Sequence, residues 1–160
     1  MAFEHADEHL DKQMTMIQVN IDDMNPEQCS YVMDLLFEQG ANDVCWVPII
    51  MKKGRPGLQL QVLTDLNLLS ALETIIFRET TTLGLRYLPA TVHRLARAYV
   101  KVQTIWGEMT VKVGYHVGEL VQYAPEFTEC EQVAKLHHIP LKQVYDEVRH
   151  QFKSVQPSQI

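Results

Sequence analysis

Two adjacent carboxylates, Asp22 and Asp23, stand between an alternating apolar segment and the start of a helix. A carboxylate pair in this position can hold a divalent cation, because magnesium sites combine one or two carboxylates with the phosphates of a substrate. The dipole of the following helix also favours acidic residues at its N-terminus without any metal. The pair is therefore a candidate metal site, with helix electrostatics as the alternative.

A cationic loop with the sequence KKGRPG follows later in the chain and contains Lys52, Lys53 and Arg55. Arginine binds phosphate through two parallel hydrogen bonds, lysine adds a point charge, and glycine lets backbone amides approach an anion closely. Residues 44–64 contain no acid. The loop is a candidate phosphate site, although it lacks the spacing of a P-loop and also suits a solubilising turn between strands.

A third polar segment joins a predicted helix to a predicted strand and offers a carboxylate and three hydroxyl groups to a ligand. Threonine runs are also common in strands, which is the structural alternative. Residues 80–107 again contain no acid. The candidate residues are Glu79, Thr80, Thr81, Thr82 and Arg86, with Arg94, Arg97 and Lys101 as second choices from their charge alone.

The distribution of charge separates the chain into three parts. The formal net charge is −6, but residues 1–43 carry ten acids and one base, whereas residues 44–118 carry four acids and nine bases. The overall charge excludes a generally basic nucleic-acid coat protein, and the basic middle predicts an anion-binding region. No apolar run approaches the length of about 20 residues that a membrane span needs, and the polar N-terminus resembles no leader peptide.

The cysteine and histidine residues show no ligand spacing. Cys29, Cys45 and Cys130 lie far apart, which favours a reduced, cytoplasmic protein with mostly buried thiols. His5 and His9 would share a helix face beside Asp7 and Glu8, so a metal site there is an alternative to a solvated tail. His93, His116, His137 and His138 are interpreted as surface or packing residues, and no catalytic nucleophile is identified.

The elements that position these residues follow the order β-α-β-β-α-β over residues 15–90. Strands are predicted from alternation and helices from apolar spacing, capped by Asn25 and by Asp65 or Asn67. This order is typical of a ferredoxin-like fold with two helices on one face of a sheet. The predicted ranges are strands at 16–22, 43–51, 58–62 and 83–87 and helices at 25–40 and 65–78, with Pro89 closing the unit.

Whether the acid pair and the lysine loop meet stays open at this point. We place the ends of the first and second strands at opposite edges of the sheet. An oligomer could then bring the two segments together.

The rest of the chain predicts a smaller subdomain over residues 91–153. Two alternating segments, 94–104 and 108–115, flank Trp106-Gly107 and predict a β-hairpin, which must pack on something because a lone hairpin is marginally stable. Helices are expected at 129–137 and from Pro140. Residues 1–14 are expected to be disordered and residues 154–160 to fray. The predicted fold class is α+β, a ferredoxin-like βαββαβ subdomain followed by a β-hairpin-plus-helices subdomain.

Four segments resemble one known family in order and spacing. The segments are NIDDMNPE (20–27), MKKGRPG (51–57), ETTTLGLR (79–86) and PEFTECEQVAKLHHIPLKQVYDEV (125–148). They are similar to the C-terminal domain of the LarC-type nickel insertion proteins over about residues 15–150. The larger N-terminal domain of that family has no counterpart in this sequence.

The resemblance implies an enzyme of the lyase class that completes the cofactor of lactate racemase. Such proteins insert Ni²⁺, their substrate, into pyridinium-3,5-bisthiocarboxylate mononucleotide to form the nickel-pincer nucleotide. They bind and hydrolyse CTP with Mn²⁺ or Mg²⁺, and their C-terminal domain is associated with CTP and forms homo-oligomers. The resemblance implies the N-terminal domain of the same protein as a partner, and it implies no binding to nucleic acid or to a membrane.

The resemblance also implies a role for each candidate residue. Lys52, Lys53 and Arg55 would neutralise the triphosphate, and Asp22 or Asp23 would hold the divalent ion. Glu79, Thr80, Thr81 and Thr82 would hydrogen-bond the nucleotide, and Arg86 would add charge. The alternatives are a regulatory module that binds a small anionic metabolite without turnover, and an RNA-binding domain. The latter is disfavoured because the first and third strands lack aromatic residues for base stacking.

Overall fold

The computed structural model describes residues 6–155, which form two compact units. The first unit comprises residues 10–92, and the second comprises residues 6–9 and 93–155 of the described chain. Within residues 6–155, none of the helices has the length and hydrophobicity needed to cross a membrane.

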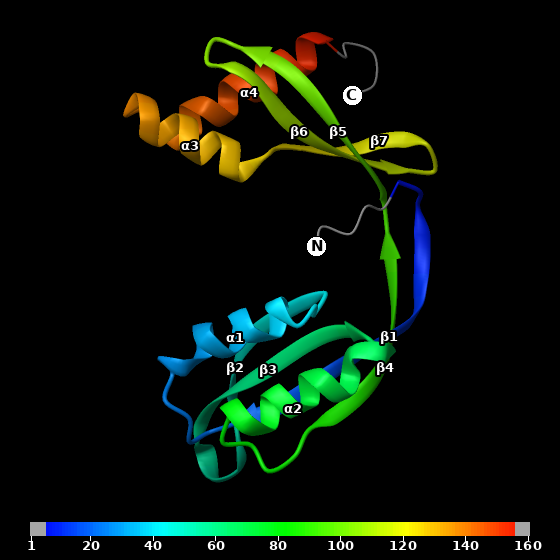
Figure 1. The fold of residues 1–160 in the computed structure, drawn as a ribbon, viewed down its shortest axis with the longest axis vertical. Coiled ribbons are helices and arrows are strands. Elements are labelled where there is room, and N and C mark those ends of the chain that lie inside the picture. Colours follow the sequence, from blue (N-terminus) through cyan, green and yellow to red (C-terminus); the bar gives the residue numbers. More distant parts are fainter. Residues whose placement is uncertain (1–5, 156–160) are drawn as a thin grey trace. The chain divides into compact units, whose positions relative to one another are not determined.

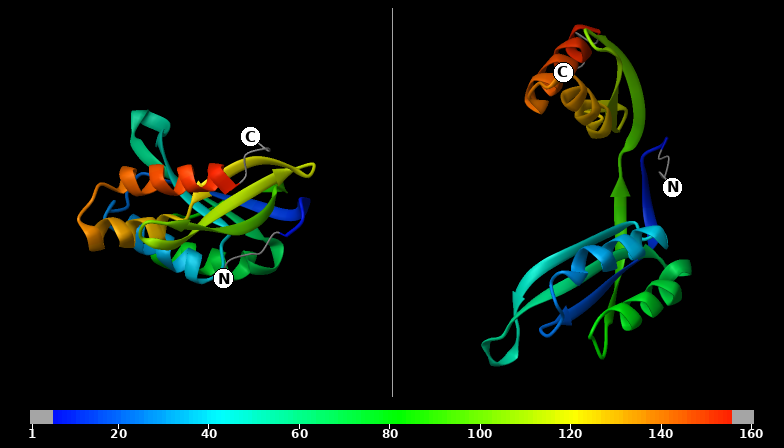
Figure 2. Two further views of the ribbon diagram at one scale, coloured as in Figure 1. Left: turned by 90° about the horizontal axis from the view of Figure 1, so that it is seen from above. Right: turned by 60° about the vertical axis from the view of Figure 1, so that its left-hand side comes forward.

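The first unit is a four-stranded sheet with two helices on one face (Figures 1 and 2). The strand order is β2-β3-β1-β4, and β3 pairs antiparallel with both β1 and β2. This arrangement confirms the predicted ferredoxin-like topology. The elements are β1 (His9–Ile21), α1 (Gln28–Glu38), β2 (Asp43–Ile50), the 3-10 turns η1 (Lys52–Gly54) and η2 (Leu66–Leu68), β3 (Pro56–Asp65), α2 (Leu69–Glu79) and β4 (Arg86–Arg94).

The core of the first unit forms because alternate strand residues and one stripe of each helix face the same side. Ile17 pairs with Val62 and Val19 with Leu60 in the β1–β3 register, and all four side chains are buried. The helices add Val32, Leu36, Leu72 and Ile76, each fully buried. The opposite face of the sheet has no helix of this unit on it (Figure 1) and carries both apolar and polar side chains, among them Gln18, Asn20, Gln59 and Gln61.

Two strand boundaries of the first unit differ from the prediction. Strand β1 begins at His9, and Met14 is buried, so the expected disorder of residues 1–14 is wrong from His9 onwards; residues 1–5 lie outside the described chain. Strand β4 starts at Arg86 and continues through Pro89 to Arg94, so Pro89 does not close the unit. Proline is tolerated there because β4 is an edge strand and needs no inward N–H donor.

The predicted helix caps bond the turns that precede the helices. The Asn25 side chain accepts a hydrogen bond from the N–H of Glu27 at 3.1 Å, but α1 begins at Gln28, and its N-cap, Glu27, makes no side-chain cap bond. Asp65 accepts from the N–H of Asn67 at 2.9 Å and caps η2, whereas the N-cap of α2 is Leu68, again without a side-chain cap bond. Gly40, with φ of +103°, terminates α1 as predicted.

The second unit is a three-stranded antiparallel sheet, β5-β6-β7, packed against two helices. The predicted hairpin and helices are confirmed, but β7 was not predicted, because a register shift at Gly114/Tyr115 interrupts its alternation. Helix α4 extends through Val155, past the expected start of fraying at residue 154. The elements are β5 (Ala96–Thr104), β6 (Gly107–His116), β7 (Glu119–Pro125), α3 (Phe127–His137) and α4 (Leu141–Val155).

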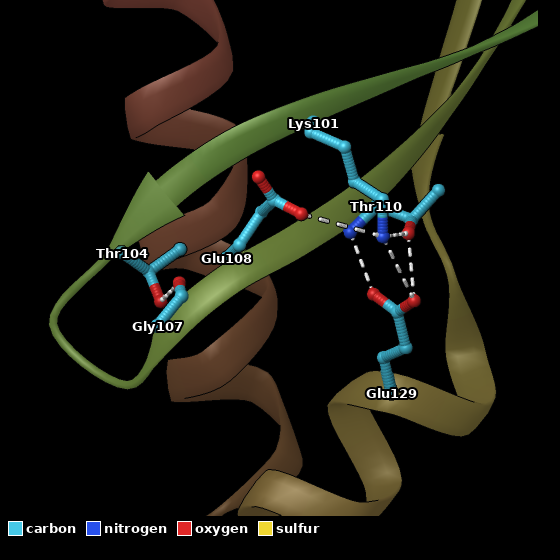
Figure 3. A network of polar contacts seen from close by, with 6 residues as sticks. All are labelled: Lys101, Thr104, Gly107, Glu108, Thr110 and Glu129. Carbon is cyan, nitrogen blue, oxygen red and sulfur yellow. Dashed lines mark hydrogen bonds and ion pairs between the residues drawn. The ribbon is translucent and has the colours of Figure 1, made fainter.

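A partly buried polar clamp fastens α3 to this sheet (Figure 3). The Glu129 carboxylate accepts hydrogen bonds from the N–H and the hydroxyl of Thr110, both at 2.6 Å, while Lys101 donates to the Thr110 hydroxyl at 2.7 Å. Burial acts to raise the pKa of Glu129, but the Thr110 hydrogen bonds and the charge of Lys101 outweigh it and hold that pKa below its ordinary value. The ionised carboxylate is therefore the form that stabilises this unit.

We predict that Glu129→Ala lowers the free energy of unfolding by about 1–2 kcal/mol at pH 7, because the buried Thr110 groups lose their acceptor. Urea unfolding measures the difference. Because the folded pKa lies below the ordinary 4.5, the contribution is complete at neutral pH and is lost as the pH falls below that value.

Glu131→Ala is the matched control, since it removes only an exposed ion pair with Lys135 on the same helix. We expect a loss of about 0.3–0.5 kcal/mol from it. If the loss of unfolding free energy caused by Glu129→Ala stays constant between pH 7 and pH 3, the ionised carboxylate of Glu129 is not the stabilising form.

Candidate functional site

The three predicted motifs meet in one chain, at one end of the sheet of the first unit. Asp22 accepts a hydrogen bond from Nη1 of Arg55 at 2.7 Å, and Asp23 accepts one from the hydroxyl of Thr81. The placement of the two strand ends at opposite edges was wrong. Strands β1 and β2 both run antiparallel to β3, so their carboxyl ends lie at the same end of the sheet, with only β3 between them.

The cationic loop is a tight turn that leaves its lysines exposed. The N–H of Met51 donates to the Arg55 carbonyl at 2.7 Å, and Lys53 and Gly54 both adopt positive φ, 63° and 71°. Among residues 6–155, neither the Lys52 nor the Lys53 ammonium group makes a hydrogen bond or an ion pair. Their charge is therefore free to attract an anion, whereas the charge of Arg55 is compensated by Asp22.

Glycine at position 57 sets the position of this loop. A Cβ atom there would lie 2.7 Å from the carbonyl oxygen of Ile21 and 2.9 Å from the sulfur of Met51. Only glycine allows the start of β3 to pass so close to the end of β1. The close approach keeps Arg55 within reach of Asp22.

A pocket of about 460 Å³ opens beside Asp22. Its volume falls in the range of small-molecule sites, and its walls are mostly apolar with one carboxylate. The lining residues are Ile21, Asp22, Met24, Pro26, Pro48, Pro56, Gly57 and Leu58. No local sequence pattern predicts this pocket, because residues from three separate segments form it.

The hydroxyl groups of the third motif have different partners. The Thr80 hydroxyl donates to the Ile76 carbonyl at 2.7 Å and the Thr82 hydroxyl to the Gly84 carbonyl at 2.8 Å, so both stabilise the end of α2 and the following loop. Thr81 alone of these three threonines bonds to the acid pair. Glu79 is the half-buried last residue of α2. Thr81 is thus the hydroxyl best placed to act with the carboxylates.

Arg86 belongs to a polar network on the helix-free face of the sheet. Its Nη2 donates to the side-chain oxygen of Asn20 at 2.6 Å, and the same oxygen accepts from Gln59 at 2.9 Å. The hydrogen bond of Arg86 goes to a neutral amide, and no acid within the described part of the chain compensates its charge. A second pocket of about 230 Å³ is lined by Gln18, Asn20, Gly84, Leu85 and Arg86. The alternation of residues in β1 puts Asn20 on this face of the sheet, but it does not predict the contact of Asn20 with Arg86.

The second-choice cations belong to the second unit. Arg94, Arg97 and Lys101 are all part of it, and Lys101 belongs to the clamp around Glu129.

The cysteine expectation holds only in part. Cys130 is buried, and burial raises the pKa of its thiol, as it does for the half-buried Cys29. Cys45, in contrast, is exposed on β2. All three are free thiols.

Two of the histidines share a partner that the sequence does not indicate. His93 and His116, which are half exposed and show no ligand spacing in the sequence, both contact Glu8. Of the pair considered at the N-terminus, His5 lies outside the described residues, and Nδ1 of His9 lies 2.7 Å from the carbonyl oxygen of Asp7.

Comparison with known proteins identifies relatives along most of the chain. The family model described as "Nickel insertion protein" matches residues 1–145. Two curated relatives are named "Pyridinium-3,5-bisthiocarboxylic acid mononucleotide nickel insertion protein". The one from Acetivibrio thermocellus is 47% identical over 88% of this chain and 34% of its own length, and the one from Clostridium acetobutylicum is 44% identical over 83% and 32%. The chain thus spans about a third of the length of these relatives.

Two solved structures share the fold. The apo form of LarC2, described as the C-terminal domain of a cyclometallase involved in the synthesis of the NPN cofactor of lactate racemase, is 35% identical with a TM-score of 0.85. The alignment covers 91% of this chain and 99% of that one. A protein from Methanopyrus kandleri is 24% identical with a TM-score of 0.62 and covers 86% of each chain, which shows the fold alone.

We predict that Gly57→Ala destabilises the first unit by about 1–3 kcal/mol, because the added methyl group overlaps a backbone carbonyl. Gly84→Ala is the matched control: a Cβ atom there meets nothing within 4 Å. We expect its effect to stay within about 0.5 kcal/mol. Urea unfolding of both variants tests the difference, and equal stabilities would show that the close approach at Gly57 is not a constraint.

Proposed function

The chain belongs to the nickel insertion protein family, and we propose that it binds CTP with a divalent cation as part of a nickel-inserting enzyme. The observation that carries the proposal is the meeting of three separate motifs through the Asp22–Arg55 and Asp23–Thr81 hydrogen bonds. Free lysines and a pocket of nucleoside size lie at the same end of the sheet.

The triphosphate is bound by the cationic loop. Lys52 and Lys53 supply uncompensated charge, and the exposed turn gives phosphate oxygens access to both. Arg55 is half-exposed, so its guanidinium can turn from Asp22 to a phosphate when a cation takes over the carboxylate. The phosphates therefore meet three cations from one turn.

The donor set of the acid pair fits Mn²⁺ or Mg²⁺. Both ions prefer oxygen ligands and accept one or two carboxylates together with phosphate oxygens and water. Asp22 and Asp23 each use one carboxylate oxygen for their side-chain contact and retain the other. The bound cation would neutralise charge on the triphosphate, while Thr81 holds Asp23 in place.

The nucleoside is held beside the loop. The mostly apolar walls of the 460 Å³ pocket suit the faces of a base or sugar, and Asp22 stands where the pocket meets the cation site. Arg86 and the Glu79–Thr82 loop lie on the other side of the acid pair and add charge and hydrogen bonds.

The larger activity is that of the whole protein. The named relatives are about two and a half times as long as this chain, and their name specifies insertion of nickel into pyridinium-3,5-bisthiocarboxylic acid mononucleotide. We assign Ni²⁺ as a substrate, bound in the product by soft sulfur ligands that suit a late divalent metal. The remaining region of such a protein would supply most of the chemistry on the precursor, in a homo-oligomeric lyase-type enzyme that hydrolyses CTP.

We predict that CTP with Mn²⁺ raises the melting temperature of the chain, because a ligand that binds only the folded state stabilises it. Lys52→Ala and Lys53→Ala should each weaken CTP binding by about ten-fold or more, with the melting temperature of the free protein unchanged. Lys142→Ala, an exposed lysine of α4 in the second unit, is the matched control and should bind CTP as the wild type does. An absence of any shift at millimolar CTP would contradict the proposal.

A second prediction concerns the cation. Asp23→Asn keeps an oxygen acceptor for Thr81 but removes the negative charge, so the gain in CTP affinity on adding Mn²⁺ should fall several-fold. Titration of CTP with and without Mn²⁺ measures this gain. Asp34→Asn, an exposed acid on α1, is the control. An unchanged Mn²⁺ dependence in Asp23→Asn would remove Asp23 from the cation site.

A further inference from the structure

A second cluster of ligand-type side chains lies in the second unit and shares no residue with the site of the first unit. Glu8 stands just before β1, His93 near the end of β4 and His116 at the end of β6. All three belong to the second unit. More than 80 positions separate Glu8 from His93, and more than 20 separate His93 from His116, so the fold alone brings the three residues together.

The three side chains converge on one point. Oε1 of Glu8 lies 2.8 Å from Nε2 of His93 and 2.6 Å from Nδ1 of His116. One donor atom from each residue lies within 4.8 Å of the others, and the two rings meet edge to face with centroids 5.9 Å apart. A metal at its usual bond lengths holds neighbouring donors about 3–3.5 Å apart, so small side-chain rotations suffice to admit an ion.

The carboxylate is oriented by the backbone. Its other oxygen, Oε2, accepts a hydrogen bond of 2.7 Å from the N–H of Val117. Val117 and Gly118 both have positive φ, 52° and 80°, and form the tight turn between β6 and β7. This backbone hydrogen bond, followed by the contact with His116, lowers the pKa of Glu8, so the ligand is ionised at neutral pH. Such an outer hydrogen bond is typical of carboxylates that bind metals.

We propose that Glu8, His93 and His116 form a binding site for a divalent late first-row transition metal ion. Two imidazoles and one carboxylate disfavour Mg²⁺ and Ca²⁺, which prefer oxygen donors throughout, and suit Ni²⁺, Co²⁺ or Zn²⁺. The side chains of His93 and His116 are about half exposed, 51% and 52%, so further coordination positions open to solvent. The site therefore binds an ion that can exchange or pass to another ligand. The proposal stands on the donor set and not on the binding of CTP.

The test is a titration of the full chain, without a tag and without CTP, with Ni²⁺ in a buffer that does not chelate. We expect one Ni²⁺ per chain, and at least a ten-fold loss of affinity in Glu8→Gln, His93→Ala and His116→Ala. His150→Ala, which removes an exposed histidine of α4 in the same unit, should bind as the wild type does. Binding that is absent in the wild type, or equal in all four variants, would overturn the proposal.

A second measurement needs no variant and so does not depend on their folding. Co²⁺ added to the wild-type chain should shift or broaden the ring resonances of His93 and His116 at one equivalent, and leave those of His137 and His150 unaffected. Equal broadening of all histidines would show only weak surface binding, and would reduce the cluster to a carboxylate that accepts hydrogen bonds from two histidines. Because CTP is absent, failure here leaves the nucleotide proposal untouched.

Discussion

The contact of Gly57 with the end of β1 is the constraint on which the site of the first unit depends. Strand β3 must begin within van der Waals distance of the Ile21 carbonyl, and only a residue without a Cβ atom permits it. Because β2, the turn and β3 form one continuous hairpin, this approach also fixes Lys52, Lys53 and Arg55. A displaced hairpin would separate Arg55 from Asp22 and leave each charge without its partner.

Under the proposed function, the charges at this end of the sheet account for a metal and a nucleotide binding together. The candidate site contains three carboxylates, Asp22, Asp23 and Glu79, and four cations, Lys52, Lys53, Arg55 and Arg86, so its net charge is +1. This charge is too small to match the roughly four negative charges of a nucleoside triphosphate, and a divalent cation would reduce the difference. An acid pair that holds this cation would then not be in conflict with an anion site.

Local chemistry made much of the fold predictable. Alternation identified β1 and β3, and Gly40 marked the end of α1, because each of these signals acts within a few residues. Asn25 and Asp65 lie near the helix starts, but they bond the turns before α1 and α2 and are not the caps of these helices. Strand β7 was not predicted because a bulge interrupts the alternation of its residues. The predicted end of β4 was too early because proline usually ends a strand, whereas an edge strand tolerates it. The candidate residues were found by type, but their partners were not: Asp22–Arg55 and Asp23–Thr81 depend on strand direction, which no local pattern encodes. The cluster of His93 and His116 with Glu8 is not predictable from any sequence pattern, because only the tertiary fold brings these residues together.

The two candidate sites differ in donor chemistry, and this difference bears on how one chain can handle two cations. Nickel binds almost any given ligand set more tightly than manganese or magnesium, so affinity alone cannot keep it from an acid pair. A pair of imidazoles strengthens nickel binding far more than magnesium or manganese binding, whereas phosphate and carboxylate oxygens discriminate less. Under the two proposals, Glu8, His93 and His116 in one unit offer nickel the better site, and Asp22 and Asp23 in the other hold the ion that accompanies the triphosphate.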